Sequence, residues 1–237
     1  MRQLFPMHSV GRAHEHESCV ARQVYAYLAE AATNEDLDRR IPFPPDYPTE
    51  WIRRVWLHDL RSVLVRPVRP TDAARLQSFV RSMSATTRRN RFHGALAGLA
   101  EHVLRYMTEV DYVNHLAFVG EVGDEAELRQ VAEARWVRRT DEPDHADFAI
   151  AVDDNYQFNG LGTRLMDLLQ RSAAARDIRC LCGHVLKSNQ RMTDWLEAHG
   201  WTMRQDPYDV GVVQMELSLQ AHRQPDLVAA GRLAVAA

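Results

Sequence analysis

The segment from Ala149 to Arg164 constrains this chain more than any other part of it. An apolar run that ends at Val152 is followed by a turn with two glycines, Gly160 and Gly162, and then by an amphipathic helical pattern. This order gathers main-chain N–H groups at the start of a helix, where a pyrophosphate binds well. The segment therefore predicts a nucleotide-cofactor site and, with it, an enzyme.

Two common nucleotide-binding turns do not fit this segment. A dinucleotide-binding turn needs a third glycine three residues after the second, and this chain has Leu165 there, so that class is disfavoured. A nucleoside-triphosphate loop needs a lysine and then Ser or Thr after its last glycine. Here Gly162 is followed by Thr163 and Arg164, which excludes that class.

The turn does contain Gln157, Gly160 and Gly162 in the spacing Gln-x-x-Gly-x-Gly. This spacing resembles the acyl-CoA motif of the GNAT N-acetyltransferase superfamily, and the resemblance extends over residues 62 to 219. Within that superfamily, the runs Arg-Phe-His-Gly-Ala-Leu at 91–96 and Gly-His-Val-Leu-Lys-Ser-Asn-Gln-Arg-Met at 183–192 look most like the acetyltransferase domain of bacterial protein-lysine acetyltransferases.

The order of predicted elements agrees with that resemblance. Apolar periodicity predicts strands at 63–68, 112–122, 130–137, 148–152, 178–186, 201–205 and 211–219, and helices from Ala73 to Met83, around Leu99 to Met107, at 161–176 and at 189–199. The resemblance implies an α/β (α+β) fold of the GNAT type. Its sheet is mixed and mostly antiparallel, with about seven strands flanked by helices, and it is splayed between the fourth and fifth strands.

Residues 1–61 and 220–237 lie outside the resemblance. We expect 1–61 to be an N-terminal helical extension with a proline-rich linker near 41–48, because two helical stripes flank the prolines: Val20, Val24, Tyr27 and Leu28 before them, and Ile52, Val55, Trp56 and Leu60 after them. Each stripe is expected to pack on the catalytic domain or on a second subunit, which leaves a homodimer open. The alanine-rich tail, 220–237, is expected to be a short helix or disordered.

The net charge and the distribution of apolar residues limit the kinds of partner that we expect for this chain. The net charge of −3 gives no reason to expect nucleic acid or an anionic membrane. No apolar run approaches the roughly 20 residues of a membrane helix, and residues 1–18 lack the apolar region of a signal peptide. We therefore expect a soluble, cytoplasmic protein.

Metal binding is not expected. Three cysteines are too few for a disulfide scaffold, and Cys180 and Cys182 are interpreted as small hydrophobic side chains of a strand. A possible ligand cluster, His8, His14, His16 and Cys19, lies in a polar terminal segment without fixed geometry.

The resemblance implies acetyl-CoA as co-substrate and a set of residues that bind it. Val152 would offer main-chain groups to the pantetheine arm, which in this family lies like an extra strand in the splay. Arg164 would add positive charge, and Asn189 would contact the cofactor past the fifth strand. The pyrophosphate would be bound by main-chain N–H groups of Gln157, Phe158, Asn159, Gly160, Leu161, Gly162 and Thr163. The alternative interpretation of the glycines is a helix entry that only needs a tight turn.

A proton acceptor is also needed, because a lysine-like amine has a pKa of about 10.4 and making it neutral at pH 7 costs about 4.6 kcal/mol. Strand alternation puts Asp147 on one face with Ala149 and Ala151, which leave room for a substrate. Asp147 matches the strand position of the catalytic glutamate in the lysine-acetylating subfamily. Asp is one methylene shorter than Glu, so a bridging water would help it to reach the amine. The alternative is that Asp147 only ends the strand.

Three further assignments stay open. Glu133 is the second candidate for the base, although an ion pair with Arg135 would make it a poor one. Arg88, Arg89 and Arg91 are interpreted as a solvated helix face, with binding of the CoA 3′-phosphate or of an acidic substrate as the alternative. His184 is interpreted as a core histidine, with an active-site role as the alternative.

The expected function is an acetyl-CoA-dependent N-acetyltransferase that works by direct attack of an amine on the thioester in a ternary complex. The tyrosine with which many GNAT enzymes protonate the leaving thiolate is replaced by Leu196, so solvent is expected to donate that proton. A protein lysine is the leading acceptor. The alternative acceptor is a small amine such as an antibiotic, a polyamine or an amino acid. The alternative function is a non-catalytic acyl-CoA sensor.

Overall fold

A computed structural model describes residues 47–94, 96–123 and 128–219, which form one mixed sheet flanked by helices. The strands lie in the order β1-β2-β3-β4-β5-β6-β8-β7, and β5–β6 is the one parallel pair in this described sheet. The strands are β1 (Arg53–Trp56), β2 (Ser62–Pro67), β3 (His115–Val122), β4 (Arg129–Arg138), β5 (His145–Val152), β6 (Cys180–Leu186), β7 (Thr202–Gln205) and β8 (Val212–Ser218). The helices are α2 (Ala73–Ser82), α3 (Ala85–Phe92), α4 (Glu101–Thr108), α5 (Leu161–Ala174) and α6 (Gln190–Ala198).

The expected fold class is confirmed, but the sheet has eight strands in place of about seven. The extra strand is β1, where the apolar stripe from Ile52 to Leu60 predicted a helix; that prediction was wrong. β1 pairs antiparallel with β2. Only Val55 of the stripe is buried, whereas Trp56 and Leu60 stay exposed. Strand pairing with β2 therefore outweighs the helical spacing. The stripe from Val20 to Leu28 and the tail 220–237 lie outside the described residues.

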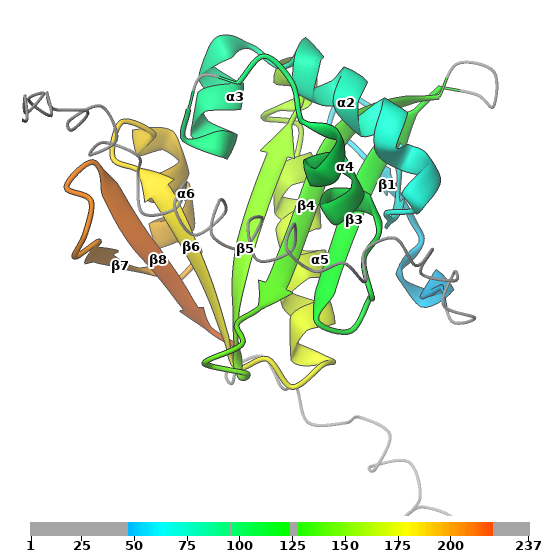
Figure 1. Cartoon of the computed structure of the whole chain (residues 1–237). Helices are drawn as coiled ribbons and strands as arrows, with labels where there is room; N and C mark the ends of the chain where they lie inside the picture. The colour runs from blue at the N-terminus through cyan, green and yellow to red at the C-terminus, as the bar shows by residue number, and fades with distance from the viewer. Residues whose placement is uncertain (1–46, 95, 124–127, 220–237) are drawn as a thin grey trace, which may run out of the picture.

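The helices form layers on the two faces of the sheet (Figure 1). α2 and α4 pack on the face that Ala151 presents, and α5 packs on the opposite face under Trp136 and Val152. Trp136 also donates a 2.9 Å hydrogen bond to the hydroxyl of Ser172 in α5. The predicted alternation in β5 is thus confirmed, with Asp147, Ala149 and Ala151 on the face of α2 and α4.

The sheet splits between β5 and β6, as the resemblance implied. Their parallel pairing runs from His145 with Cys180 to Asp147 with Cys182 and ends there. Beyond this point the two strands diverge (Figure 1). The second halves of β5 and β6 therefore border a gap that opens toward the carboxyl ends of both strands.

The ring of Phe148 lies at the point where the strands part. An added Cβ on Gly183 of β6 would come within 2.2 Å of this ring. The ring also packs against Trp201, with 4.7 Å between the ring centroids. Gly183 therefore lacks a side chain because Phe148 occupies the space.

We expect Gly183→Ala to destabilise the fold by about 1–3 kcal/mol, the usual cost of forcing extra atoms into a packed site. Gly162→Ala is the control, since no atom lies within 4 Å of an added Cβ there. Urea unfolding followed by circular dichroism measures both. Equal stability of the two variants would contradict this account of Gly183.

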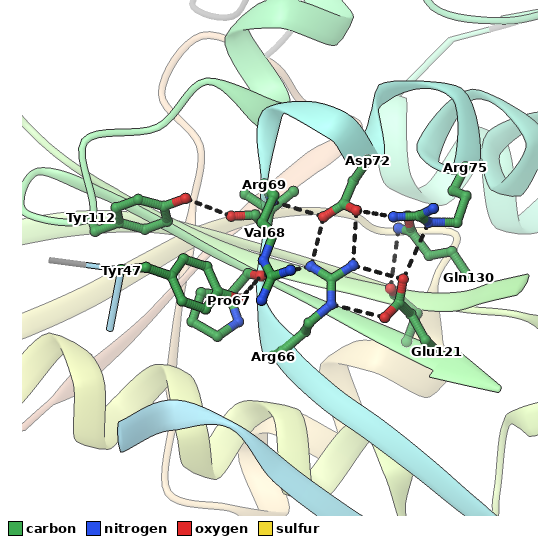
Figure 2. A network of polar contacts seen from close by, with 11 residues as sticks. Tyr47, Arg66, Pro67, Val68, Arg69, Asp72, Arg75, Tyr112, Glu121 and Gln130 are labelled. Carbon is green, nitrogen blue, oxygen red and sulfur yellow. Dashed lines mark hydrogen bonds and ion pairs between the residues drawn. The ribbon is translucent and has the colours of Figure 1, made fainter. Parts of the chain in front are cut away.

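A buried ionic network fixes the start of α2 (Figure 2). Arg66 of β2 donates two hydrogen bonds to Asp72, of 2.7 and 2.8 Å, and two to Glu121 of β3, of 2.8 and 2.7 Å. Asp72 also accepts the main-chain N–H of Arg69 at 2.7 Å, and Arg75 caps the network from α2. This network ties β2, β3 and the helix that covers the site into one unit.

No helix in the described ranges is long and apolar enough to cross a membrane. In the same ranges, no three His, Cys, Asp or Glu side chains come together as a metal site. The cluster from His8 to Cys19 is outside the described residues.

Candidate active site

The loop between β5 and α5 adopts a conformation that depends on glycine. Gly160 has a φ of +87°, and a Cβ there would lie 3.0 Å from the imidazole of His58. Phe158 also has a positive φ, +60°. Gln157 turns its side chain back and donates a 3.0 Å hydrogen bond to the carbonyl of Val152. The glutamine and the first glycine of the motif thus fix the shape of the loop.

The β1–β2 hairpin supports this loop from outside. The main chain of His58 donates to the carbonyl of Asn159 at 3.2 Å. Arg61 donates to the carbonyl of Asn155 at 2.9 Å, and its guanidinium lies 4.2 Å from the ring centroid of Tyr156. The strand that the sequence reading missed is therefore part of the framework of the site.

The loop presents a row of main-chain donors. Within the described chain, no hydrogen bond is formed by the N–H groups of residues 157 to 163. Leu161, Gly162 and Thr163 form the first turn of α5, whose N–H groups have no partner inside the helix. A helix start of this kind favours an anion. These residues fit the pyrophosphate of a CoA molecule.

The edge of β5 that borders the gap offers further donors. Asp153 donates to the carbonyl of Val131, and the register makes every second residue from 145 to 153 bond to β4. The residues between them, including Ile150 and Val152, therefore turn their main-chain groups toward the gap, where the carbonyl of Val152 already accepts the side chain of Gln157. An extended chain with amide groups, such as pantetheine, can pair with this edge.

Other predicted cofactor residues lie around the mouth of the gap. Arg164 is exposed in the first turn of α5, and Asn189 is the residue just before α6. Phe158 is 72% exposed, and the guanidinium of Arg191 from α6 lies 4.4 Å from its ring centroid. This contact spans the two sides of the gap, and the sequence analysis did not foresee Arg191.

Asp147 lies at the closed end of the gap. Its side chain is 43% exposed, so water and a substrate can reach it. Arg139, just after β4, donates two hydrogen bonds to its Oδ1, of 3.1 and 2.8 Å. The carboxylate is therefore held in one orientation, on the face of the sheet where Ala149 leaves space.

Glu133 is placed very differently. It is 2% exposed and binds both Arg135 and Arg91, the latter at 3.0 Å. Burial alone raises the pKa of Glu133, but the charges of Arg135 and Arg91 outweigh it and hold the pKa below its ordinary value. Such a carboxylate is a structural anchor and a poor proton acceptor.

The position of Arg91 corrects the expectation of a solvated helix face. Its side chain is only 13% exposed and ties α3 to β4 through Glu133. The start of α3 is tied to the loop between β5 and α5, where Asp154 accepts hydrogen bonds from Thr87 at 2.7 Å and from the main chain of Ser84 at 3.1 Å. α3 is therefore clamped over the sheet at both ends.

His184 is nearly buried and has a carboxylate beside it. Its Nε2 is 3.5 Å from Oδ2 of Asp206, a residue of the β7–β8 loop, and the two side chains are 10% and 2% exposed. His93, which ends α3, has its ring against the main chain of His184. The Nδ1 of His93 has no hydrogen-bond partner among the described residues. The pair formed by His184 and Asp206 lies on the same face of the sheet as Asp147.

Residues 111–201 match the acetyltransferase (GNAT) family. A curated acetyltransferase of Pseudomonas aeruginosa is 32% identical over 163 residues, which cover 69% of this chain and 87% of the relative. The chain belongs to the GNAT acetyltransferase family. It is therefore an acyl-CoA N-acyltransferase, and its family uses acetyl-CoA as co-substrate.

Two further relatives refine this placement. Acetyltransferase Pat of Mycolicibacterium smegmatis is 30% identical over 155 residues, which cover 65% of this chain and 45% of Pat, so this chain spans less than half of that protein. The crystal structure of the GNAT domain of S. lividans PAT superposes with a TM-score of 0.67 at 27% identity and covers 73% of this chain and 99% of that one. The resemblance to protein-lysine acetyltransferase domains is thereby confirmed.

Proposed function

We propose that this GNAT enzyme transfers the acetyl group of acetyl-CoA to a lysine side chain of a protein, by direct attack in a ternary complex. The observation that carries the proposal is the position of Asp147. It lies at the closed end of the gap between β5 and β6, oriented by Arg139 and accessible to solvent.

In this proposal the cofactor lies in the gap. Main-chain groups of Ile150 and Val152 pair with the pantetheine arm, and the N–H groups from Gln157 to Thr163 hold the pyrophosphate. Arg164 adds positive charge at the helix start, and Asn189 contacts the cofactor from the start of α6. An N–H group at the end of β5 also polarises the thioester carbonyl as charge develops on its oxygen.

Asp147 is the proposed proton acceptor for the incoming ammonium group. Both hydrogen bonds from Arg139 go to Oδ1, so Oδ2 is the atom assigned to the acceptor, directly or through one water. Glu133 is not proposed as the base, because two guanidinium groups hold it ionised in a closed site.

Exposed side chains on β7 and in the β7–β8 loop favour a protein as the acceptor. All four residues of β7 are exposed, and Tyr208 and Val210 of the β7–β8 loop are 84% and 86% exposed. Small ligands are usually bound in concave sites that bury most of their surface. Exposed apolar side chains in this loop, together with the solvent-accessible carboxylate of Asp147, suit a lysine presented on a protein surface.

Calorimetric titration with acetyl-CoA, with NAD and ATP as controls, and thiol release on adding acceptors test the function. We expect selective binding of acetyl-CoA, with thiol release that is faster for lysine-containing proteins than for polyamines, amino acids or aminoglycosides. Mass spectrometry then locates the acetyl group. Faster release with a small amine would favour the small-molecule alternative, and binding with no release by any acceptor would favour the sensor.

Gly160→Ala and Gly200→Ala give a matched pair for the cofactor site. Both glycines have positive φ values, +87° and +84°, so both variants bear a similar backbone cost of roughly 1 kcal/mol. Only Gly160 lies in the proposed pyrophosphate loop, and only there does the new Cβ contact another residue, His58 of the β1–β2 hairpin. We expect Gly160→Ala to weaken acetyl-CoA binding at least tenfold and Gly200→Ala to leave it unchanged.

A further inference from the structure

The reaction removes two protons from the acceptor nitrogen, because a lysine ammonium becomes an amide with a single N–H. The first proton leaves before attack, and Asp147 is proposed to take it. The second leaves the nitrogen after the C–N bond has formed, while the departing CoA sulfur needs a proton. The family position for a tyrosine that would supply this proton holds Leu196, which is fully buried in the core.

His184 is placed to serve this second transfer. It lies two residues beyond Cys182, the last residue of β6 that pairs with β5, so it borders the gap at the level of Ala149. The thiols of Cys180 and Cys182 contact each other at 3.8 Å, which shows that alternate residues of β6 share a face. Cys182 pairs with Asp147, and the ring of His184 therefore faces the same side as the Asp147 carboxylate.

Asp206 holds the ring from the other side. Its Oδ1 accepts the main-chain N–H groups of Tyr208 and Asp209, at 2.8 and 2.9 Å. Its Oδ2 faces Nε2 of His184 at 3.5 Å, and both side chains are nearly buried. A carboxylate fixed by its own loop thus lies beside Nε2 of the imidazole, where it favours a proton on that nitrogen.

We propose that His184 carries the second proton from the acceptor nitrogen to the CoA sulfur, with Asp206 as its positioning partner. This inference rests on the acetyl transfer proposed above. The amine nitrogen attacks the carbonyl carbon of the thioester and forms the C–N bond. The imidazole nitrogen that does not face Asp206 accepts a proton from that nitrogen. The C–S bond then breaks, the proton passes to the sulfur, and His184 returns to its neutral form.

The surroundings of His184 keep it neutral at pH 7, as this role requires. Burial lowers its pKa below the ordinary value, and Arg139 acts in the same direction. Asp147 from β5 and Asp206 from the β7–β8 loop oppose this shift. His93, just after α3, does not add a charge near neutral pH, because burial, assisted by the charge of Arg91, lowers its pKa to about 4.

The test is His184→Ala in the full chain, assayed for thiol release with and without added imidazole. We expect kcat to fall about 100-fold, within the usual range for general acid–base catalysis, while acetyl-CoA binding stays within twofold of wild type. Added imidazole should raise the kcat of His184→Ala at least tenfold. This rescue should saturate as the imidazole concentration rises. His199→Ala is the control, because His199 ends α6 and binds the carbonyl of Trp195; its kcat should not change.

Two further variants separate proton transfer from a structural role. In wild type, kcat should fall as the pH is lowered through the pKa of His184, since the ring then becomes protonated. His184→Gln should remove this fall, and Asp206→Asn should move it to lower pH because Asp206 raises that pKa. A kcat for His184→Ala within twofold of wild type overturns the inference. The inference is also overturned if imidazole fails to restore the lost kcat of His184→Ala and His184→Gln keeps the wild-type pH profile. Absence of thiol release by wild type would instead overturn the acetyl transfer itself.

Discussion

Asp147→Asn should lower kcat by about 100- to 1000-fold at pH 7, which is the range for loss of a general base. The carboxylate is proposed to receive the first proton of the acceptor ammonium, and an amide cannot do so. At pH 10 roughly a quarter of the acceptor is already neutral, because its pKa is about 10.4, whereas at pH 7 almost none of it is. The loss should therefore shrink to less than tenfold there. Steady-state thiol release across this pH range measures both values.

Two control variants test whether the loss is specific to the carboxylate of Asp147. Asp144→Asn removes a carboxylate three residues away that pairs with His145 at the surface, and its kcat should match wild type. Asp147→Glu restores the carboxylate with one more methylene, the residue type of the lysine-acetylating subfamily, and should keep most of the activity. An Asp147→Asn loss of the same size at pH 7 and pH 10 would show that Asp147 positions Arg139 or the strand and is not the base.

The central part of the fold was predictable because its signals are local. The strand that ends at Val152, the turn with Gly160 and the helix from Leu161 follow one another in sequence, and each has its own periodicity or backbone requirement. The face of Asp147 followed from simple alternation along a strand. These features need no knowledge of distant neighbours.

The prediction failed where partners from distant parts of the chain decide the outcome. The stripe from Ile52 to Leu60 has helical spacing, yet β1 forms because β2 offers a strand partner. Arg91 reads as a solvent-exposed charge until the sheet places Glu133 beneath it, 42 residues away. The approach of Asp206 to His184 depends on the pairing of β6 with β8, which has no local signal. The elements of the site were readable, but most of its side-chain contacts were not.

Arg66→Met should be the most destabilising single change outside the proposed catalytic groups. Arg66 is 8% exposed and neutralises two carboxylates that are 1% and 3% exposed, Asp72 and Glu121. Breaking a buried ion pair leaves uncompensated charge and costs about 3–5 kcal/mol. Arg75 still contacts both carboxylates, so we expect the lower end, about 3 kcal/mol. Arg171→Met is the control, since Arg171 and Asp167 form an exposed pair, and such pairs contribute little.

The pH dependence of this loss gives a sharper test than its size. In wild type, burial raises the pKa of Asp72, but Arg66 outweighs it and lowers the pKa below 3.8, so this stabilisation is lost as the pH falls through the folded-state pKa. In Arg66→Met the buried carboxylate of Asp72 loses its main partner and takes up a proton at higher pH, which relieves the cost. The difference in unfolding free energy between wild type and Arg66→Met should therefore shrink from pH 7 to pH 4. Urea unfolding at both pH values measures it, and a difference that stays constant or grows would mean that Arg66 stabilises the fold by packing and not by charge.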